Sequence, residues 1–336
     1  MFARTSDIQH PAGLVIRTPL LVPSFSSRGF GFSGKPEART SEVSGPLEYC
    51  SAWLTETMLV SAYDLHHGHV PCMDRWPAEL VFVDSGGYET GGYQELSALY
   101  VSDDPPKPWD EASLRCVLDH WPVESPAVFV SFDHPNERAP LGEQIARAKE
   151  LFARYPSQVH DFLIKPETHD QQYIKVESVK EHIAQLAGFH VIGVTEKELG
   201  NSQLKRLKSI VRIRGALDDA GISAPLHVFG GLDPLSSIMY FIAGAEVFDG
   251  LTWLRYSYHE GKAIYRMNYG SLALGINTLD QQVFCKAWTD NVSYLQHLQL
   301  KMRYYPVKGD LAVFEELAKP ITRAYETLCG DLGRAI

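Results

Sequence analysis

The sequence predicts an α/β fold in which eight parallel strands and their helices close into a (β/α)8 TIM barrel. Short apolar runs rich in β-branched residues alternate with helical stretches, and several runs end in an acidic residue followed by turn residues. Buried parallel strands have this pattern, and strands that alternate with helices are typical of barrels and of open doubly wound sheets. The first strand is not followed by a GxGxxG motif, which disfavours an open dinucleotide-binding sheet.

Eight segments have the pattern of buried strands. They are residues 58–62, 80–83, 127–132, 162–164, 191–194, 226–229, 246–248 and an eighth near residues 263–265. Helical periodicity lies between several of them, over residues 141–155, 176–187, 203–220 and 236–243. Proline stands near the start of two of these helices, at Pro140 and Pro234, as is common at helix N-termini.

We expect three regions along the chain. Residues 1–47 contain two apolar runs among Gly, Ser and Pro, which predict an N-terminal β-hairpin, small sheet or lid. Residues 48–278 are expected to form the catalytic barrel. Residues 279–336 are expected to be a mostly helical C-terminal extension, over residues 288–304 and 311–328.

Composition restricts the classes of function. The formal net charge of −10 excludes a generally basic nucleic-acid binder but leaves room for a local basic groove. No run of 18 apolar residues predicts a membrane span, and the N-terminus does not resemble a signal peptide. The five cysteines are scattered without a CxxC pair, so we expect a reduced, cytoplasmic protein.

Three carboxylates follow apolar runs that lie far apart in the sequence: Asp84, Asp133 and Asp249. The carboxyl ends of barrel strands meet at one mouth, where active sites lie. Two carboxylates there suit substitution at a sugar anomeric carbon, because one can attack C1′ while the other moves the proton of the leaving group. A third carboxylate can accept the N–H edge of a purine.

The residues that follow Asp84 also favour a ligand-binding site. Ser85 and Gly86 follow Asp84, and glycine lets the backbone approach a flat ligand on which Tyr88 can stack. Taken alone, Asp84 also fits a helix N-cap and Asp249 an ordinary strand-to-helix turn. Their joint placement at strand ends favours a site.

Six short segments, in matching order and spacing, resemble the conserved boxes of tRNA-guanine transglycosylases. They are AGLVIRTPLLVP at residues 12–23, SAYDL at 61–65, VDSGGYE at 83–89, SFD at 131–133, HVFGGLDP at 227–234, and GAEVFD at 244–249 with Arg255. The resemblance implies a barrel enzyme that exchanges a guanine in a nucleic acid for a free 7-deazaguanine base of the preQ0 or preQ1 kind.

The resemblance also implies roles for single residues. Asp249 matches the nucleophile that forms a covalent glycosyl intermediate, Asp84 the acid/base residue and Asp133 the reader of the purine edge. Tyr88 matches the aromatic residue that stacks on the base. The other residues expected to line the base site are Ser85, Gly86, Gly193, Gly230 and Gly231, and those expected to hold phosphates are Arg255 and Arg266.

The sequence departs from this family in two places. Lys165 stands near the position of a base-reading glutamine. The structural zinc cluster is reduced to Cys285, with Asp290 at the place of the histidine ligand, so we expect no cofactor and leave zinc open. A second group of metal-ligand types fits polar loop residues better than a metal site; it consists of His66, His67, His69 and Cys72.

These departures, with an unfamiliar segment at residues 193–202 and no appended RNA-binding domain, suggest a divergent branch that modifies DNA, slightly favoured over tRNA. A homodimer or a partner protein remains open. Two other classes stay as alternatives. One is a carboxylate-pair glycoside hydrolase, for which Trp253 is the aromatic residue near a strand end. The other is a non-catalytic barrel subunit, disfavoured because both catalytic acids are present.

Overall fold

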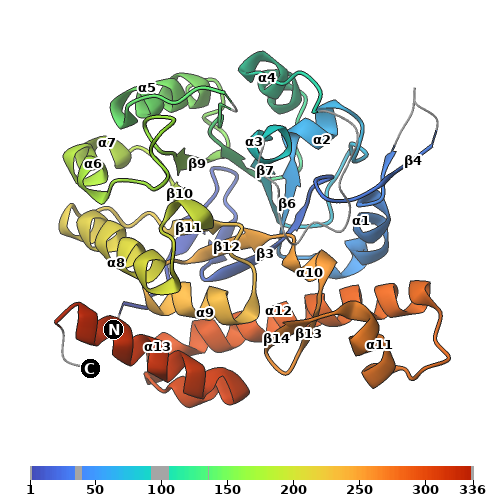
Figure 1. Cartoon of the computed structure of the whole chain (residues 1–336). Coiled ribbons are helices and arrows are strands. Elements are labelled where there is room, and N and C mark those ends of the chain that lie inside the picture. The colour runs from blue at the N-terminus through green and yellow to red at the C-terminus, as the bar shows by residue number, and fades with distance from the viewer. Residues whose placement is uncertain (1, 35–39, 92–105, 135, 334–336) are drawn as a thin grey trace.

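The computed structural model describes residues 2–34, 40–91, 106–134 and 136–333, and its centre is a closed barrel of eight parallel strands (Figure 1). Strands that are neighbours in the barrel are successive in the chain, and the last strand pairs with the first. They are β3 (Leu20–Phe25), β6 (Thr57–Ser61), β7 (Leu80–Asp84), β8 (Ala127–Val130), β9 (Val159–Ile164), β10 (Val191–Thr195), β11 (Leu226–Phe229) and β12 (Val247–Gly250). The predicted α/β barrel is confirmed.

The eighth strand is not the one that the sequence predicted. β3 pairs with both β12 and β6, so the barrel wall begins well before residue 48. The segment near residues 263–265 instead contributes to β14 (Lys262–Ile264), which pairs with β13 (Ser257–His259) in a separate antiparallel sheet. Every residue of β3 is buried, as a barrel strand requires, whereas β14 is partly exposed.

The N-terminal hairpin closes the bottom of the barrel. It consists of β1 (Asp7–Gln9) and β2 (Val15–Arg17), which pair antiparallel with Ile8 opposite Ile16. These two side chains pack in one apolar cluster with Leu80 and Val191, the first residues of their strands. The hairpin therefore plugs the amino ends of the strands, and the predicted N-terminal β-hairpin is confirmed.

Helices surround the barrel wall and follow the predicted periodicity closely. They are α1 (Ser44–Cys50), α2 (Ala62–His66), α3 (Gly87–Thr90), α4 (Glu111–Asp119), α5 (Leu141–Phe152), α6 (Val176–Glu181), α7 (Ile183–Leu186), α8 (Gln203–Asp219) and α9 (Pro234–Ile242), with the 3-10 turns η1 (Ser51–Trp53) and η2 (Glu196–Glu198). The strand β4 (Phe32–Ser33) pairs with β5 (Thr40–Ser41) outside the barrel. Asp233 caps α9 by accepting hydrogen bonds from the backbone of Leu235 and Ser236.

The C-terminal region is helical, as expected, and packs along one side of the barrel (Figure 1). Within residues 279–336 it contains α12 (Asp280–Lys308), η3 (Leu311–Leu317) and α13 (Ala318–Asp331), and the short helices α10 (Thr252–Arg255) and α11 (Arg266–Ala273) precede it. Gln299 of α12 accepts a hydrogen bond of 2.7 Å from the backbone N–H of Leu21, which ties this helix to β3.

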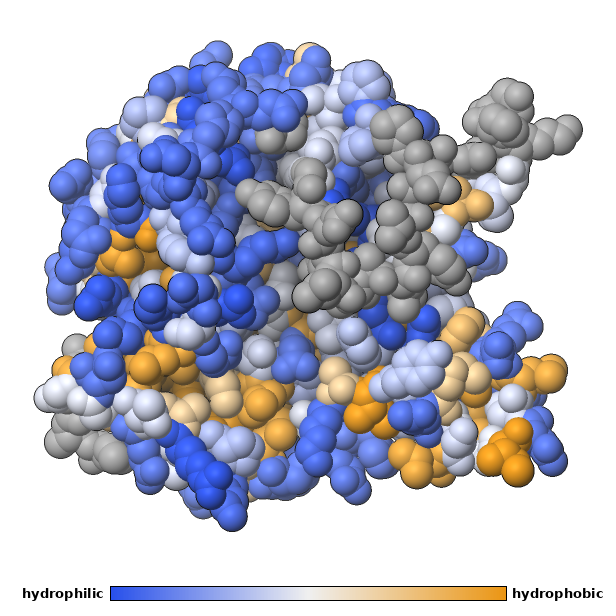
Figure 2. Space-filling model, viewed as in Figure 1, coloured by the Kyte–Doolittle hydropathy of each residue, from blue (hydrophilic) through white to orange (hydrophobic). Residues whose placement is uncertain are grey.

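The polarity of the surface differs between the C-terminal helices and the helices around the rest of the barrel. Figure 2 shows more apolar surface along the C-terminal helices than over the helices on the other side of the barrel. Exposed large apolar side chains in this region include Leu272, Ile276 and Leu279, in α11 and its connection to α12. No helix within the described part of the chain has the length and apolar character needed to span a membrane.

Candidate active site

Three carboxylates meet at the carboxyl ends of the strands. Asp84 is the last residue of β7, Asp249 lies in β12 and Asp133 follows β8. Burial raises the pKa of Asp84 to about 7, and the charges of Asp249 and Asp133 add to the shift. Because the carboxyl ends of all eight parallel strands form one rim of the closed barrel, the three acids share one mouth. At neutral pH, Asp84 is therefore divided between its acid and its carboxylate form.

Asp249 is held in one orientation by groups from two strands. Ser24 Oγ in β3 donates to its Oδ2 at 2.8 Å, and the backbone N–H of Gly230, just past β11, donates to its Oδ1 at 3.1 Å. Gly230 has a φ of 78°, a conformation that glycine adopts without strain, and this turn aims its N–H at the carboxylate. His227 Nε2 lies 3.2 Å from the same Oδ1.

Behind Asp249 lies a buried pair that the sequence did not single out. His227 Nδ1 in β11 is 2.7 Å from Asp161 Oδ2 in β9, and neither side chain is exposed. Burial lowers the pKa of His227, but the charges and hydrogen bonds of Asp161 and Asp249 outweigh it and raise the pKa to about 9. His227 is therefore an imidazolium at neutral pH. The available signal was an acid inside an apolar run, VHDFLI.

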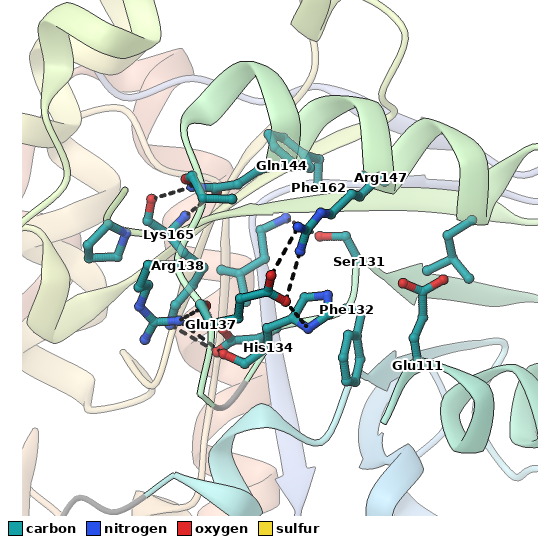
Figure 3. A pocket seen from close by; sticks show the side chains of 16 residues that line it. Glu111, Ser131, Phe132, His134, Glu137, Arg138, Gln144, Arg147, Phe162 and Lys165 are labelled. Carbon is teal, nitrogen blue, oxygen red and sulfur yellow. Dashed lines mark hydrogen bonds and ion pairs between the residues drawn. The ribbon is translucent and has the colours of Figure 1, made fainter. Parts of the chain in front are cut away.

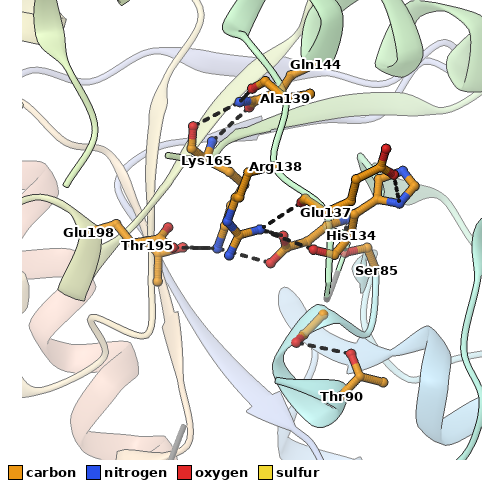
Figure 4. Close-up of polar contacts among 12 residues, drawn as sticks. Ser85, Thr90, His134, Glu137, Arg138, Ala139, Gln144, Lys165, Thr195 and Glu198 are labelled. Atoms are coloured by element: carbon orange, nitrogen blue, oxygen red, sulfur yellow. Dashed lines mark hydrogen bonds and ion pairs between the residues drawn. The ribbon is translucent and has the colours of Figure 1, made fainter. Parts of the chain in front are cut away.

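Asp133 belongs to a second charged network, drawn in Figure 4. Its backbone N–H donates to Ser85 Oγ at 3.2 Å, which links the loops after β7 and β8. Its carboxylate lies 3.0 Å from Lys165 Nζ and 3.3 Å from the guanidinium of Arg138. Lys165 also lies 2.9 Å from Glu198.

Lys165 keeps its charge between these acids. Burial lowers the pKa of Lys165, but Asp133 and Glu198 outweigh it and raise the pKa above its usual value. Gln144 of α5 fixes the backbone of Lys165 by two hydrogen bonds of 3.0 Å each. Arg138, Gln144 and Lys165 line one pocket with Asp133, shown in Figure 3, and the same pocket is lined by the apolar side chains of Leu151 and Phe162.

Tyr88 joins the loop after β7 to the loop after β10. Arg28 lies over its ring at 5.2 Å from the centroid, and Lys197 of η2 lies at 5.8 Å. Arg28 also donates to the carbonyl oxygen of Tyr88 at 2.8 Å. An aromatic ring bordered by two cations fits contact with an anionic polymer that carries flat bases.

The two arginines expected to hold phosphates are both buried. Arg255 donates to the carbonyl oxygen of Arg28 at 2.9 Å, so it supports the loop that carries Arg28. Arg266 donates to the carbonyl oxygen of Leu254 and lies over the ring of Phe284 at 4.4 Å. This burial does not fit phosphate binding by Arg266. Arg28 and Lys197, which the sequence left unassigned, lie over the ring of Tyr88, and Arg255 donates to the Tyr88 hydroxyl at 3.4 Å.

The glycines expected at the base site have different structural roles. A Cβ at Gly86, whose φ is 84°, would lie 2.7 Å from Cβ of Tyr63, and a Cβ at Gly87 would lie 2.7 Å from Cβ of Asp133. Both glycines let the loop after β7 approach its neighbours. Gly193 lies within β10, where a Cβ would meet the ring of Phe229 at 2.6 Å, so it serves packing inside the barrel. Gly231 packs beside Val228.

The metal-ligand types do not assemble into a site within the described residues, where no group of three or more His, Cys, Asp or Glu side chains could hold a metal ion. His69 is buried against Asp64 at 3.0 Å. Burial and the neighbouring His66 lower the pKa of His67 to about 4, and Cys72 is exposed. In the C-terminal region, Cys285 is a free thiol on α12, and Asp290 accepts hydrogen bonds from Tyr269 and Lys286.

Trp253 is not placed to serve as a sugar platform. It is fully buried in α10, donates to the carbonyl oxygen of Ser24 at 3.2 Å and packs edge-on against Phe25. Comparison with known proteins adds no assignment, because no protein-family model matches the chain and no curated protein matches it significantly.

Proposed function

We propose that this protein exchanges a guanine in a nucleic acid, with DNA slightly favoured over tRNA, for a free 7-deazaguanine base. The observation that carries the proposal is the meeting of Asp84, Asp133 and Asp249 at one barrel mouth, with the pKa of Asp84 raised to about 7. All three acids lie in the segments that resemble the boxes of tRNA-guanine transglycosylases.

The first displacement uses Asp249 as the nucleophile. Its carboxylate forms a bond to C1′ of the target nucleotide while the C1′–N9 bond breaks, and the electron pair leaves with the guanine. Asp84 in its acid form supplies the proton that makes the guanine a neutral leaving group. A covalent glycosyl ester on Asp249 results, as in retaining glycosyl transfer.

The second displacement reverses these roles. The Asp84 carboxylate takes the N9 proton of the incoming base, whose nitrogen attacks C1′ and releases the Asp249 carboxylate. Asp84 can serve in both directions because burial and the neighbouring charges bring its pKa close to 7, where both of its forms are populated. Two inversions at C1′ retain the configuration of the sugar.

Recognition of the base falls to Asp133 and its surroundings. A carboxylate can accept hydrogen bonds from the two N–H donors on the edge of guanine. The Ser85 hydroxyl accepts a hydrogen bond of 3.2 Å from the backbone N–H of Asp133 and so holds Asp133 in place. The target base must leave its stack to reach this depth, and Tyr88 offers a ring on which it can stack. Arg28 and Lys197 beside that ring suit the phosphates of the same strand.

DNA is slightly favoured as the polymer because the chain departs from the tRNA enzymes where those carry zinc ligands and a base-reading glutamine. Asp290 stands at the histidine position and is bound to Lys286 and Tyr269. Lys165 stands near the glutamine position and forms ion pairs with Asp133 and Glu198.

The test is incubation of the full chain with labelled guanine or preQ0 and, in separate reactions, duplex DNA, single-stranded DNA and tRNA. Incorporation of label into DNA by the wild type, and none by Asp249→Asn, is the expected result. Incorporation of label into tRNA alone would support the base-exchange reaction and reject DNA as the polymer. Release of free sugar from glycosides without base exchange would favour a hydrolase, and tight polymer binding without turnover a non-catalytic subunit.

A further inference from the structure

We infer that Asp161 and His227 form a positioning pair that orients Asp249 for attack on C1′ and stabilises its charge again when it departs. The inference deepens the proposed function and rests on it. The three side chains form one line across the inside of the barrel, from β9 through β11 to β12. Neither Asp161 nor His227 reaches the mouth, so both act through Asp249.

The geometry of this line is specific. Asp161 Oδ2 lies 2.7 Å from His227 Nδ1, and His227 Nε2 lies 3.2 Å from Asp249 Oδ1. The bond to Asp161 fixes the orientation of the ring, so that Nε2 faces Asp249; second carboxylates commonly orient histidines in this way. Asp161 and His227 are both fully buried, and Asp249 is 7% exposed.

The surroundings of His227 contain no competing charge among the groups that contact it in the described structure. Asp161 on β9 and Asp249 on β12 are its charged neighbours. Phe82 of β7 meets its ring edge-on at 5.5 Å, and Phe229 of its own strand stacks on it at 3.8 Å. Gly193, its register partner on β10, adds no side chain. Two carboxylates thus share one cation in a buried, aromatic setting.

This arrangement acts on both displacements. When Asp249 bonds to C1′, it gives up its negative charge and becomes an ester, while the leaving guanine takes the electron pair and the proton of Asp84. When the incoming base attacks C1′, the carboxylate charge returns beside the imidazolium and the Gly230 N–H, which stabilise it as a leaving group. His227 itself neither gives nor takes a proton in either step.

The test measures formation and breakdown of the covalent intermediate in single turnovers across pH, for the wild type and His227→Asn. Without the imidazolium, the buried carboxylates lose their shared counter-charge, and the pKa of Asp161, which burial raises and His227 lowers, rises further. The acidic limb of intermediate formation should move up by about one to two pH units. Breakdown at neutral pH should slow about tenfold or more, because the positive charge 3.2 Å from the departing carboxylate is lost.

Two further variants sharpen the comparison. Asp161→Asn should shift the same limb in the same direction by a smaller amount, and its effect should not add to that of His227→Asn, because both act through one contact chain. His160→Asn is the matched control: His160 neighbours Asp161 in sequence, but it stacks on Phe152 and contacts the carbonyl oxygen of Tyr155. Its pH profile should match the wild type.

A folded His227→Asn protein with a wild-type acidic limb and wild-type breakdown rate would overturn the inference while the proposed function stands. If His227→Asn does not fold, the same assay on Asp161→Asn tests the inference. An Asp161→Asn protein whose pH profile of intermediate formation matches the wild type would also overturn the inference. Absence of base exchange by the wild type on every polymer would instead reject the proposed function, and this inference with it.

Discussion

Lys165 Nζ lies 3.0 Å from Asp133 Oδ2 and 2.9 Å from Glu198 Oε1, so one buried ammonium neutralises two carboxylates from different loops. Arg138 approaches the other oxygen of Asp133 at 3.3 Å. The proposed reader of the purine edge therefore lies inside a network in which Lys165 and Arg138 balance the charges of Asp133 and Glu198.

Replacement of Lys165 by glutamine removes that balance. Asp133 and Glu198 then lose the cation that pairs with both of them and repel each other, so Asp133 is no longer held in place to face the N–H edge of guanine. We expect the KM for free guanine to rise about tenfold or more. Steady-state exchange kinetics with varied base concentration measure this. Lys149→Gln, on the exposed face of α5, is the control.

Asp84 is expected to reduce the stability of the native protein at alkaline pH. The folded state raises the pKa of its carboxyl to about 7, so it binds this proton more tightly than the unfolded chain, where the pKa is about 3.9. This contribution to stability is fully present below about pH 4 and is lost as the pH rises through about 7. Asp84→Asn should therefore be more stable than the wild type at pH 8, by about 1–2 kcal/mol.

Denaturant unfolding at pH 4 and pH 8 checks this prediction, because the two proteins should differ only at the higher pH. Equal stability at both values would reject the raised pKa of Asp84. In the exchange assay, Asp84→Asn and Asp84→Ala should form no covalent intermediate, since neither side chain can protonate the leaving base.

Lys197 should contribute to polymer affinity through charge alone. It is exposed on η2 and lies 5.8 Å from the centroid of the Tyr88 ring. For Lys197→Gln, we expect weaker binding to all sequences alike, and a plot of log affinity against log salt whose slope falls in magnitude by about 1. Fluorescence anisotropy with labelled oligonucleotides gives both values. Lys205→Gln, at an exposed position of α8, should leave the slope unchanged.

Gly87 should be intolerant of a methyl group because of its distance from Asp133. A Cβ there would lie 2.7 Å from Cβ of Asp133, so Gly87→Ala must displace one of the two loops. We expect a several-fold higher KM for the base with little change in thermal stability. At Gly188 the nearest atom to an added Cβ is the Cε of Lys149 at 3.8 Å, so Gly188→Ala should behave as the wild type.

The barrel could be predicted because its strands are short apolar runs bounded by turn residues, and this local pattern survives in the sequence. The strand that was misplaced shows the limit. Residues 20–22 follow closely on another apolar run, and local sequence does not distinguish a hairpin partner from a barrel strand. Only the pairing of β3 with β12 and β6, more than 200 and about 35 residues away along the chain, settles its place.

The acids at strand ends could be predicted for the same reason, because strand ends are visible in sequence. The buried groups that orient these acids could not be predicted from the sequence. Asp161 lies inside β9 and faces His227 only because β9, β10 and β11 are adjacent in a closed wall. Arg266 shows the converse, since a cation that looks available in sequence is buried against Leu254 and Phe284.

The central claim is tested most directly by locating the covalent bond. The wild type is mixed with nucleic acid without an incoming base, denatured, digested and analysed by peptide mass spectrometry. The account predicts a nucleotide adduct on Asp249, absent from Asp249→Asn, which should fold as the wild type does and exchange no base. An adduct on a different side chain, or base exchange retained by Asp249→Asn, would contradict the account.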